Sequence, residues 1–507
     1  MTEFWVIGRN MDEVGSAGGA GKKMGRYLRE ILEKYTKTVV WGTGDFYAQY
    51  RELFAHQFAY FVDNDVKKWG CFLDGKEICP PEKLADEDDK NTLVIVCNHY
   101  FEEISNQIKQ YGKFSLIDIV TMGLLNEKER NVTAQKPMKA DRLVAVYGGI
   151  HAMWQTNGSR RFIEGQCAQI RRANFYTIEM IPLLFYEEGR QDSVYLALSA
   201  DGCYFGIFSV YEFVEMYPRV RGFVIHSPYY SHGTVKVLLD SIAVEKSILY
   251  YIHDFSCICF YRFLHKNQEL CIDENGKFCC SSCSEKCRRR KRVDFYRALF
   301  EKYRALLAAP SADTKKKAEQ FYRNVKIVEL PHLEYETETF QKSVNSRIRI
   351  AYIGAAIWHK GWEPYVRLVE RFHQKYDFYC MGDCPERLRI PDVTYVSVGL
   401  YGYQGMPSMT EALTAHGIDI AYIGSLWAET YSYTYYEAYE AGCFIITNTR
   451  SGNVCSQVRQ NGNGLVFSDE DEMADWLETE KVGRDVQNMN KRIKNVRDSG
   501  KFLSYLE

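Results

Sequence analysis

Two glutamates eight residues apart offer the most specific chemistry in this chain. Glu429 follows a short apolar segment, residues 418–424, and Glu437 precedes a second apolar segment. The pattern predicts a strand, a loop, a helix over residues 431–440 and another strand, with Gly442 in the left-handed turn that ends the helix. The N–H groups at a helix start attract phosphate, and two carboxylates accept hydrogen bonds from hydroxyls of one extended ligand. The run therefore predicts a site for a sugar nucleotide.

The same run resembles the E-x7-E signature of the retaining glycosyltransferases of the GT-B fold, the group that includes glycogen synthase. Three further landmarks resemble that family: Tyr352-Ile353-Gly354 leading to His359-Lys360-Gly361, then Ser451-Gly452-Asn453, then residues 461–466. The resemblance covers residues 138–477 and implies an α/β fold with two facing Rossmann-like domains. It also implies a nucleotide-sugar donor and no catalytic metal.

The resemblance assigns roles to single residues. Glu437 would bind the ribose hydroxyls of the nucleotide, and the catalytic Glu429 would bind hydroxyls of the transferred sugar. Lys360 would meet the diphosphate, where a positive charge stabilises the leaving group. The predicted donor site is completed by Gly354, Thr430 and Tyr431.

The other predicted site residues lie earlier in the chain. His253 follows the apolar residues 248–252, and the family places a catalytic histidine there, near the transferred sugar. Gly158 and Arg160 follow the apolar residues 143–147, where a glycine lets the backbone approach a phosphate or the acceptor. Taken alone, such a histidine or glycine is more often structural, so these predictions depend on the resemblance.

Ala355 departs from the family pattern, which commonly has an arginine five residues before the lysine. Three explanations remain open. The helix N-terminus after Glu429 carries more of the diphosphate charge, another basic residue such as His359 or Arg160 substitutes, or catalysis is weakened.

Seven of the 16 cysteines lie between Cys257 and Cys287. Because the chain is expected to be cytoplasmic, disulfides are disfavoured and thiolate-bound metal is the better interpretation. Some relatives of the family carry a similar cysteine-bearing insertion. A structural zinc ion is predicted, with the ligands Cys259, Cys279, Cys283 and Cys287 and with Cys280 as a substitute for Cys279. An iron–sulfur cluster or free thiols are the alternatives.

Composition limits the partners. Lys and Arg number 64 against 66 Asp and Glu, a net charge of −2, so no global field favours nucleic acid or membrane. The basic run from Arg288 to Arg292 predicts contact with anionic lipid or a phosphate-bearing acceptor. No finger-like spacing supports nucleic acid. Without a signal peptide pattern or a run of ~18 apolar residues, we expect a cytoplasmic protein, with peripheral contact at the inner membrane face.

Four segments are predicted from these patterns. Residues 1–133 form a Rossmann-like accessory domain, and residues 139–332 form the acceptor-side domain with the cysteine-rich insertion 255–292. Residues 345–480 bind the nucleotide sugar, and residues 481–507 form a helical tail. Residues 331–346 are polar and without apolar periodicity, which is typical of a linker.

The first of these segments has a weak dinucleotide fingerprint. Gly42-Thr43-Gly44 follows the first predicted strand, and Asp63 follows the second, about 20 residues on. Tyr47 occupies the place of the third glycine. A docking domain without a ligand is the equal alternative.

The sequence as a whole predicts a retaining glycosyltransferase. It would transfer a sugar from a nucleotide-diphosphate-sugar donor to a glycan, lipid-linked or other acceptor, in bacterial polysaccharide or cell-envelope biosynthesis. One alternative is a non-catalytic, zinc-stabilised binding protein on the same fold, with Ala355 as the first sign of lost catalysis. The other is a nicotinamide-dependent oxidoreductase or epimerase that uses the glycine turn at Gly42.

Overall fold

A computed structural model describes residues 26–54, 58–98, 100–128, 140–153, 157–189, 195–228, 231–259, 261–266, 269–271, 283, 286–399 and 405–507. Helices and mostly parallel sheets make up these residues, which confirms the predicted α/β class. The chain divides into two compact units. The N-terminal unit is Val6–Leu249 with Leu503–Glu507, and the C-terminal unit is mainly Tyr250–Phe502. The predicted domain boundaries stay predictions.

The N-terminal unit contains a seven-stranded sheet in the order β3-β4-β2-β1-β5-β6-β9. Its five central strands are parallel, and β3 and β9 pair antiparallel at the edges. Strand β5 is buried at every position and apolar after Thr92, as expected for a parallel strand covered on both faces. The strands are β1 (Lys37–Trp41), β2 (Phe61–Val62), β3 (Phe72–Leu73), β4 (Lys76–Cys79), β5 (Thr92–Val96), β6 (Ser115–Asp118) and β9 (Phe185–Tyr186).

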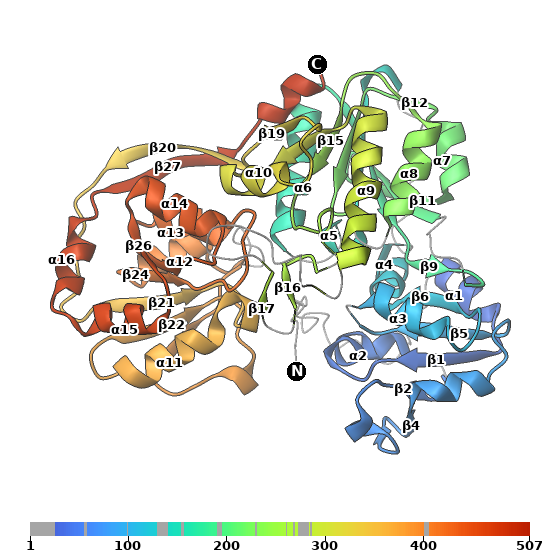
Figure 1. The fold of residues 1–507 in the computed structure, drawn as a ribbon, viewed down its shortest axis with the longest axis horizontal. Coiled ribbons are helices and arrows are strands. Elements are labelled where there is room, and N and C mark those ends of the chain that lie inside the picture. The colour runs from blue at the N-terminus through green and yellow to red at the C-terminus, as the bar shows by residue number, and fades with distance from the viewer. Residues whose placement is uncertain are drawn as a thin grey trace. The chain divides into compact units, whose positions relative to one another are not determined.

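Helices α1 (Arg26–Glu33), α2 (Asp45–Tyr50), α3 (Phe101–Ile108) and α4 (Ile119–Lys128) accompany this sheet (Figure 1). Gly42 has φ +111° after β1, and a Cβ there would lie 2.6 Å from the Cys97 carbonyl oxygen, which excludes a side chain. Asp63 accepts hydrogen bonds from the Thr43 amide at 3.1 Å and from Lys68 at 3.0 Å. It also accepts from the Asp65 amide at 2.9 Å. Both oxygens of the Asp63 carboxylate, which would bind the ribose of a dinucleotide, therefore already have hydrogen-bond partners within the chain.

A second sheet of the N-terminal unit contains the strands β11-β10-β8-β7-β13 in that order. They are β7 (Leu143–Gly148), β8 (Tyr176–Pro182), β10 (Tyr195–Ala200), β11 (Cys203–Ser209) and β13 (Gly222–His226). The connecting helices are α5 (Ile150–Met153), α6 (Gly158–Arg172), α7 (Val210–Met216) and α8 (His232–Ser241). Strands β7, β8 and β13 are parallel, and β10 pairs antiparallel with both β8 and β11. Strand β15 (Ile248–Tyr251) then leads from this unit into the next.

The C-terminal unit contains a six-stranded parallel sheet in the order β23-β22-β21-β24-β25-β26. The strands are β21 (Arg349–Ile353), β22 (Asp377–Met381), β23 (Val393–Val396), β24 (Ile420–Ile423), β25 (Phe444–Asn448) and β26 (Gly464–Phe467). The order in which the chain adds strands to the sheet reverses between β21 and β24. Open α/β sheets bind ligands beyond the carboxyl ends of the strands at such a point. The predicted site residues of this half follow these two strands.

Helices cover both faces of this sheet (Figure 1). One face carries α11 (Trp362–Phe372) and α15 (Glu470–Glu478), which are joined by two hydrogen bonds between Arg367 and Glu470 at 2.8 and 2.6 Å. The other carries α12 (Met409–Ala415), α13 (Tyr433–Glu440) and α14 (Asn453–Asn461). Four elements precede this sheet in the sequence: α9 (Lys286–Tyr303), β18 (Leu306–Ala309), α10 (Ala312–Glu319) and β19 (Ile327–Glu329).

The predicted linker and the predicted helical tail differ from what the structure contains. Strand β20 (Leu333–Thr339) pairs antiparallel with β27 (Lys491–Asp498), and only α16 (Lys481–Asn488) of the tail is an α-helix. Every second residue of β20 is acidic, and its partner strand is basic. Glu338 accepts from Arg492 at 2.7 Å, and its carboxylate is 2.9 Å from Lys494. Cross-strand charge pairs therefore stabilise a ribbon where apolar periodicity is missing.

Among the described residues, no helix has the length and apolarity needed to cross a membrane.

Candidate functional site

The loops after β21 and β24 interlock at the carboxyl edge of the six-stranded sheet. We call residues 354–361 the Lys360 loop and residues 424–432 the Glu429 loop. A Cβ on Gly361 would lie 2.2 Å from the Gly424 carbonyl oxygen, so only glycine permits this approach. The Leu426 amide donates to the His359 carbonyl at 2.8 Å. The two loops thus form one packed structure.

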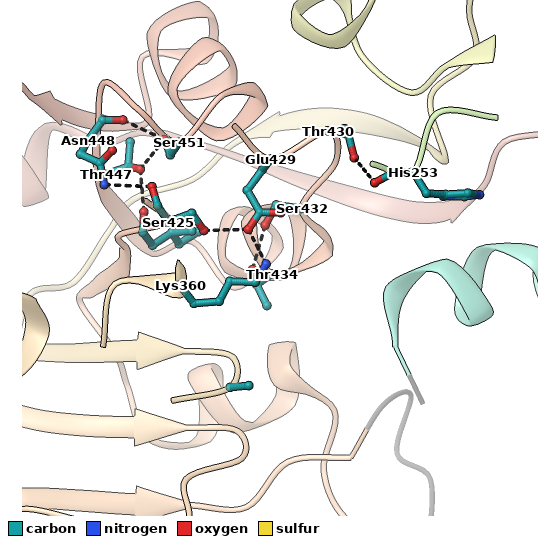
Figure 2. A network of polar contacts seen from close by, with 12 residues as sticks. His253, Lys360, Ser425, Glu429, Thr430, Ser432, Thr434, Thr447, Asn448 and Ser451 are labelled. Atoms are coloured by element: carbon teal, nitrogen blue, oxygen red, sulfur yellow. Dashed lines mark hydrogen bonds and ion pairs between the residues drawn. The ribbon is translucent and has the colours of Figure 1, made fainter. Parts of the chain in front are cut away.

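The Glu429 carboxylate lies where these loops meet. Its side chain is only 3 % exposed, and its Oε1 accepts hydrogen bonds from Lys360 Nζ and, at 2.7 Å, from Ser425 Oγ. Figure 2 shows both donors reaching the same carboxylate. The Lys360 side chain is 34 % exposed, so it is in part open to solvent, unlike the carboxylate it contacts. The sequence prediction that Glu429 and Lys360 belong to one site is consistent with this contact.

The backbone of Glu429 is held from the α14 side. The Asn453 amide donates to the Glu429 carbonyl at 2.9 Å. Gly452 has φ +61°, and a Cβ there would lie 2.8 Å from the Glu429 amide nitrogen and 2.7 Å from the Ala428 carbonyl carbon. The Ser451-Gly452-Asn453 landmark therefore packs directly against the Glu429 loop.

Short polar side chains at the end of β25 and just after it form a network beside Ser425 (Figure 2). The Asn448 side-chain amide donates to the Ser425 carbonyl at 3.2 Å, and Ser451 Oγ donates to the Asn448 carbonyl at 2.8 Å. Thr447 Oγ1 lies 2.6 Å from the Ile423 carbonyl oxygen and 2.8 Å from Ser451 Oγ. This network fixes the end of β24 relative to the end of β25.

Thr430 connects the Glu429 loop to His253. Thr430 Oγ1 donates to the His253 carbonyl at 2.7 Å, so His253 meets this loop through its backbone (Figure 2). The His253 ring is stacked beside Tyr251 and packs against His332, with centroids 6.1 and 5.6 Å apart. Burial lowers the pKa of His253 to about 3, so its ring is neutral at physiological pH. Its predicted catalytic role stays a prediction and would be that of a neutral imidazole.

Tyr431 points into an aromatic cluster. Its ring stacks on Tyr436 at 4.8 Å between centroids and packs against His332 at 4.3 Å. Its hydroxyl accepts from the Leu333 amide at 3.1 Å. The side chain is thus used in packing, and a donor contact at this position would come from the backbone.

Glu437 lies on the second turn of α13, half-buried, one helix turn and more beyond the Glu429 loop. The order strand, loop, helix, strand agrees with the sequence prediction, and Gly442 ends the helix with φ +71°. Glu429 and Glu437 therefore lie on a loop and on the helix that follows it, and their joint role in one site stays a prediction.

Gly354 and Ala355 begin the Lys360 loop. Gly354 has φ +115°, and a Cβ there would meet nothing within 4 Å, which leaves open space beside its backbone. The Ala355 carbonyl accepts from the Tyr352 hydroxyl at 2.6 Å. His359, a suggested substitute for the missing arginine, is buried, and its ring stacks on Phe263 at 5.1 Å between centroids.

Gly158 and Arg160 lie in the first turn of α6, and α5 separates that helix from β7. From the sequence we expected these residues in the turn directly after the strand. The structure has the short helix α5 between that strand and them. The Asn157 side chain accepts from the Arg160 amide at 2.9 Å and caps α6. Arg160 Nε donates to Glu164 at 2.7 Å. Their predicted role at the acceptor or a phosphate stays a prediction.

The predicted zinc ligands are described only in part. Cys259 is buried, and burial raises the pKa of its thiol, whereas Cys283 is half-buried. Cys279 and its substitute Cys280 lie outside the described residues, as does the side chain of Cys287. Within the part of the chain that the structure describes, no group of three or more His, Cys, Asp or Glu is arranged to hold a metal. The donors that are described suit zinc, because both are thiols.

Several residues of this neighbourhood were not predicted from the sequence. Ser425 contacts the Glu429 carboxylate, and Trp427 lies under Lys360 Nζ, 5.5 Å from the ring centroid. Ser311 and Thr314 contact the Thr430 carbonyl at 2.9 and 3.2 Å. The run Ser425 to Glu429 could have suggested Ser425, but residues over a hundred positions from Thr430 leave no local signal.

The arrangement combines a partly exposed cation, a buried carboxylate and the start of a helix at a strand-order reversal. An ammonium group and helix N–H groups suit a diphosphate, and carboxylates suit sugar hydroxyls. These are the parts needed to hold an anionic sugar nucleotide.

Comparison with known proteins gives one family match and several structural likenesses. Residues 34–114 match the family described as C2185-like, N-terminal. This segment contains β1, β2, β3, β4 and β5 of the seven-stranded sheet. No match was found among curated proteins.

Among solved structures, the chain is similar to sucrose-phosphate synthase from Thermosynechococcus elongatus, with 12% identity, a TM-score of 0.43, and coverage of 69% of this chain and 92% of that chain. It is similar to HepE from Anabaena in complex with UDP, with 11% identity, a TM-score of 0.43, and coverage of 68% and 92%. It is also similar to a glycosyltransferase from Rickettsia africae, with 10% identity, a TM-score of 0.36, and coverage of 90% and 91%. At these TM-scores the likeness does not decide the activity of this chain.

Proposed function

We propose that this chain is a retaining glycosyltransferase that takes a sugar from a nucleotide-diphosphate-sugar donor. The acceptor class is a glycan, a lipid-linked glycan or a related polyol. The observation that carries the proposal is the contact between Lys360 and Glu429 at the strand-order reversal between β21 and β24. This contact holds a cation and a buried carboxylate where open α/β sheets bind ligands.

In this proposal Lys360 exchanges partners when the donor binds. The ammonium group turns from Glu429 toward the diphosphate, and Glu429 then accepts from hydroxyls of the transferred sugar. Ser425 Oγ, 2.7 Å from Glu429 Oε1, keeps one donor on the carboxylate throughout. Glu437 accepts from the ribose hydroxyls. Because a buried carboxylate with a single remaining donor is costly, the sugar hydroxyls must replace the ammonium group.

The reaction breaks the bond between the anomeric carbon and the diphosphate oxygen and forms one between that carbon and an acceptor oxygen. The proton of the acceptor hydroxyl passes to the leaving diphosphate, so no metal and no enzyme base is required. Lys360 and the N-terminus of α13 stabilise the charge that develops on the leaving group. Attack on the face that the diphosphate leaves retains the anomeric configuration.

A zinc ion is part of the same proposal, as a structural group bound by Cys259, Cys279, Cys283 and Cys287. It would hold the insertion together and would take no part in the chemistry. Phe263 of that insertion stacks on His359 and makes an edge contact with Trp427, with centroids 4.7 Å apart. The insertion therefore packs on both loops of the site. The basic residues from Arg288 to Arg292 are proposed to contact anionic lipid or a phosphate-bearing acceptor at the inner membrane face.

The test is release of nucleotide diphosphate from a panel of nucleotide sugars, with cell-extract acceptors, followed by mass spectrometry. We expect Glu429→Gln and Glu437→Ala each to lower release by about 100-fold or more. Glu440→Ala is the matched control, because Glu440 lies on the same helix and bonds to Thr410 at 3.0 Å. Equal release by wild type and Glu429→Gln would contradict the proposal.

Ala355 favours a second candidate, a sugar-nucleotide-binding protein without transferase activity. The same panel separates the two. Calorimetric binding of one nucleotide sugar without release of the diphosphate, in the presence of acceptors, identifies the binding protein.

A further inference from the structure

The peptide group between Thr430 and Tyr431 is held by hydroxyl groups from a distant part of the chain. Ser311 Oγ donates to the Thr430 carbonyl at 2.9 Å, and Thr314 Oγ1 donates to the same oxygen at 3.2 Å. Ser311 precedes α10 and Thr314 lies in its first turn. All three residues are buried, so water does not replace either donor. A carbonyl oxygen has two lone pairs, and both are used here.

Thr430 is held a second time, through its own hydroxyl. Thr430 Oγ1 donates to the His253 carbonyl at 2.7 Å (Figure 2). The Thr430 side chain and its carbonyl therefore contact two separate segments, each more than a hundred residues away in sequence. Glu429 is adjacent, and its own carbonyl accepts from the Asn453 amide. The carbonyl groups of Glu429 and Thr430 are thus both held by hydrogen bonds, which fixes the orientation of the two peptide groups.

We propose that Ser311 and Thr314 are positioning residues for the Glu429 carboxylate. The inference depends on the proposed function, in which Glu429 binds the transferred sugar. Without the two hydroxyls, the buried Thr430 carbonyl lacks donors, and the peptide rotates to find others. Such a rotation moves Glu429 away from Lys360 and Ser425. A displacement of about 1 Å in a catalytic group lowers turnover by roughly 100-fold.

The test uses the full chain with Ser311→Ala and Thr314→Val combined. We expect kcat for sugar transfer to fall by about 10- to 100-fold, with the KM for the nucleotide sugar changed by less than about threefold. Thr314→Ser keeps the donor and is expected to retain wild-type kcat. Ser408→Ala is the matched control, because Ser408 Oγ caps α12 at 3.3 Å from the Glu411 amide, away from the Glu429 loop. It separates loss of a helix cap from loss of the contact to Thr430.

A second measurement does not require activity. Hydrogen exchange followed by mass spectrometry reports how often the Glu429 loop opens. In the double variant we expect exchange across residues 424–432 to be about tenfold faster or more, with Ser408→Ala unchanged there. Unchanged protection of this loop overturns the inference, and so does wild-type kcat in a double variant whose loop exchanges faster. If the wild type releases no nucleotide diphosphate, the proposed function fails, and the exchange data still decide whether the hydroxyls hold this loop.

Discussion

Lys360 Nζ donates to Oε1 of Glu429, and this contact joins a carboxylate that is 3 % exposed to a lysine that is one-third exposed. The pair lies on two loops separated by 69 residues. It therefore both links the loops and supplies the two charges that the proposed reaction needs.

A double-mutant cycle measures this link in the free protein. We expect Lys360→Met and Glu429→Gln to show a coupling free energy of about 1 kcal/mol or more in urea unfolding. Loss of the lysine alone is the costlier change, because a buried carboxylate then keeps only Ser425. The matched cycle on Arg367 and Glu470, which are 56% and 46% exposed, should give well under about 1 kcal/mol. Equal coupling in both cycles contradicts a special role for the first pair.

Two glycines with nearly the same φ test the packing behind Glu429. Gly452 and Gly462 have φ +61° and +62°, but only at Gly452 would a Cβ meet the Glu429 loop. We expect Gly452→Ala to cost about 2 kcal/mol or more and to lower sugar transfer. Gly462→Ala, in the αL turn after α14, should cost about 1 kcal/mol and leave transfer unchanged. Part of the difference reflects ψ, which is −118° at Gly452, so transfer activity is the decisive readout.

His253 should make stability depend on pH. Its pKa is about 3 in the folded protein, because of burial, against 6.5 in the unfolded chain. The unfolded chain therefore binds the extra proton first, and stability falls as the pH drops below 6.5 toward 3. We expect the wild type to lose up to about 1.4 kcal/mol per pH unit relative to His253→Gln over that range. Paired urea titrations between pH 7 and 5 measure it, and a difference that stays constant with pH would count against a neutral, buried ring.

Asp118 should act in the opposite direction. Burial raises the pKa of Asp118 to about 7, although the amides of Thr121 and Val120 lower it. The unfolded carboxyl ionises near 3.8, so stability is lost as the pH rises from there to 7. We expect Asp118→Asn to gain about 3 kcal/mol on the wild type between pH 4 and 7. Asp63→Asn is the control: burial raises the Asp63 pKa, but bonds from Thr43, Asp65 and Lys68 outweigh it and the net pKa is lowered. Its difference from wild type should therefore be flat above pH 5.

Zinc content tests the cysteine prediction. We expect about one zinc ion per chain by elemental mass spectrometry. Cys259→Ala and Cys283→Ala should lose the metal and loosen the insertion, seen as faster hydrogen exchange around Phe263. Cys203→Ala is the control, since that thiol is exposed in the other unit. Metal-free wild type, purified without chelator, would remove zinc from the proposal.

The sequence was informative where chemistry and periodicity are local. The apolar runs at β21, β24 and β25 and the glycine that ends α13 predict those three strands and the places of Glu429 and Glu437 between two of them, but not β22, β23 or β26. Residues 333–339 were predicted to be a linker because only Leu333 and Tyr335 among them are apolar, too few to give a clear period, although both pack in or against the core. Charge pairs with residues 491–498 add to that packing, and the alternating acids were the available signal.

Contacts across long sequence separations could not be predicted at all. Nothing in the residues around Thr430 indicates that Ser311 and Thr314 reach its carbonyl, since the partners are 119 and 116 residues away. The inward direction of Tyr431 was hidden for the same reason, because its partner is the amide of Leu333. Such pairs follow from how the elements assemble.

The ribbon of β20 and β27 has a consequence for how this protein can be rearranged. Thr339 and Lys491 are register partners, so the two ends of residues 340–490 lie side by side. All six strands of the parallel sheet fall within that segment, and the paired strands β20 and β27 flank its two ends. A segment whose ends adjoin can be circularly permuted or moved to another scaffold with a short join. Residues 340–490 can thus be exchanged as one segment at this ribbon, and under the proposed function we expect donor preference to move with them.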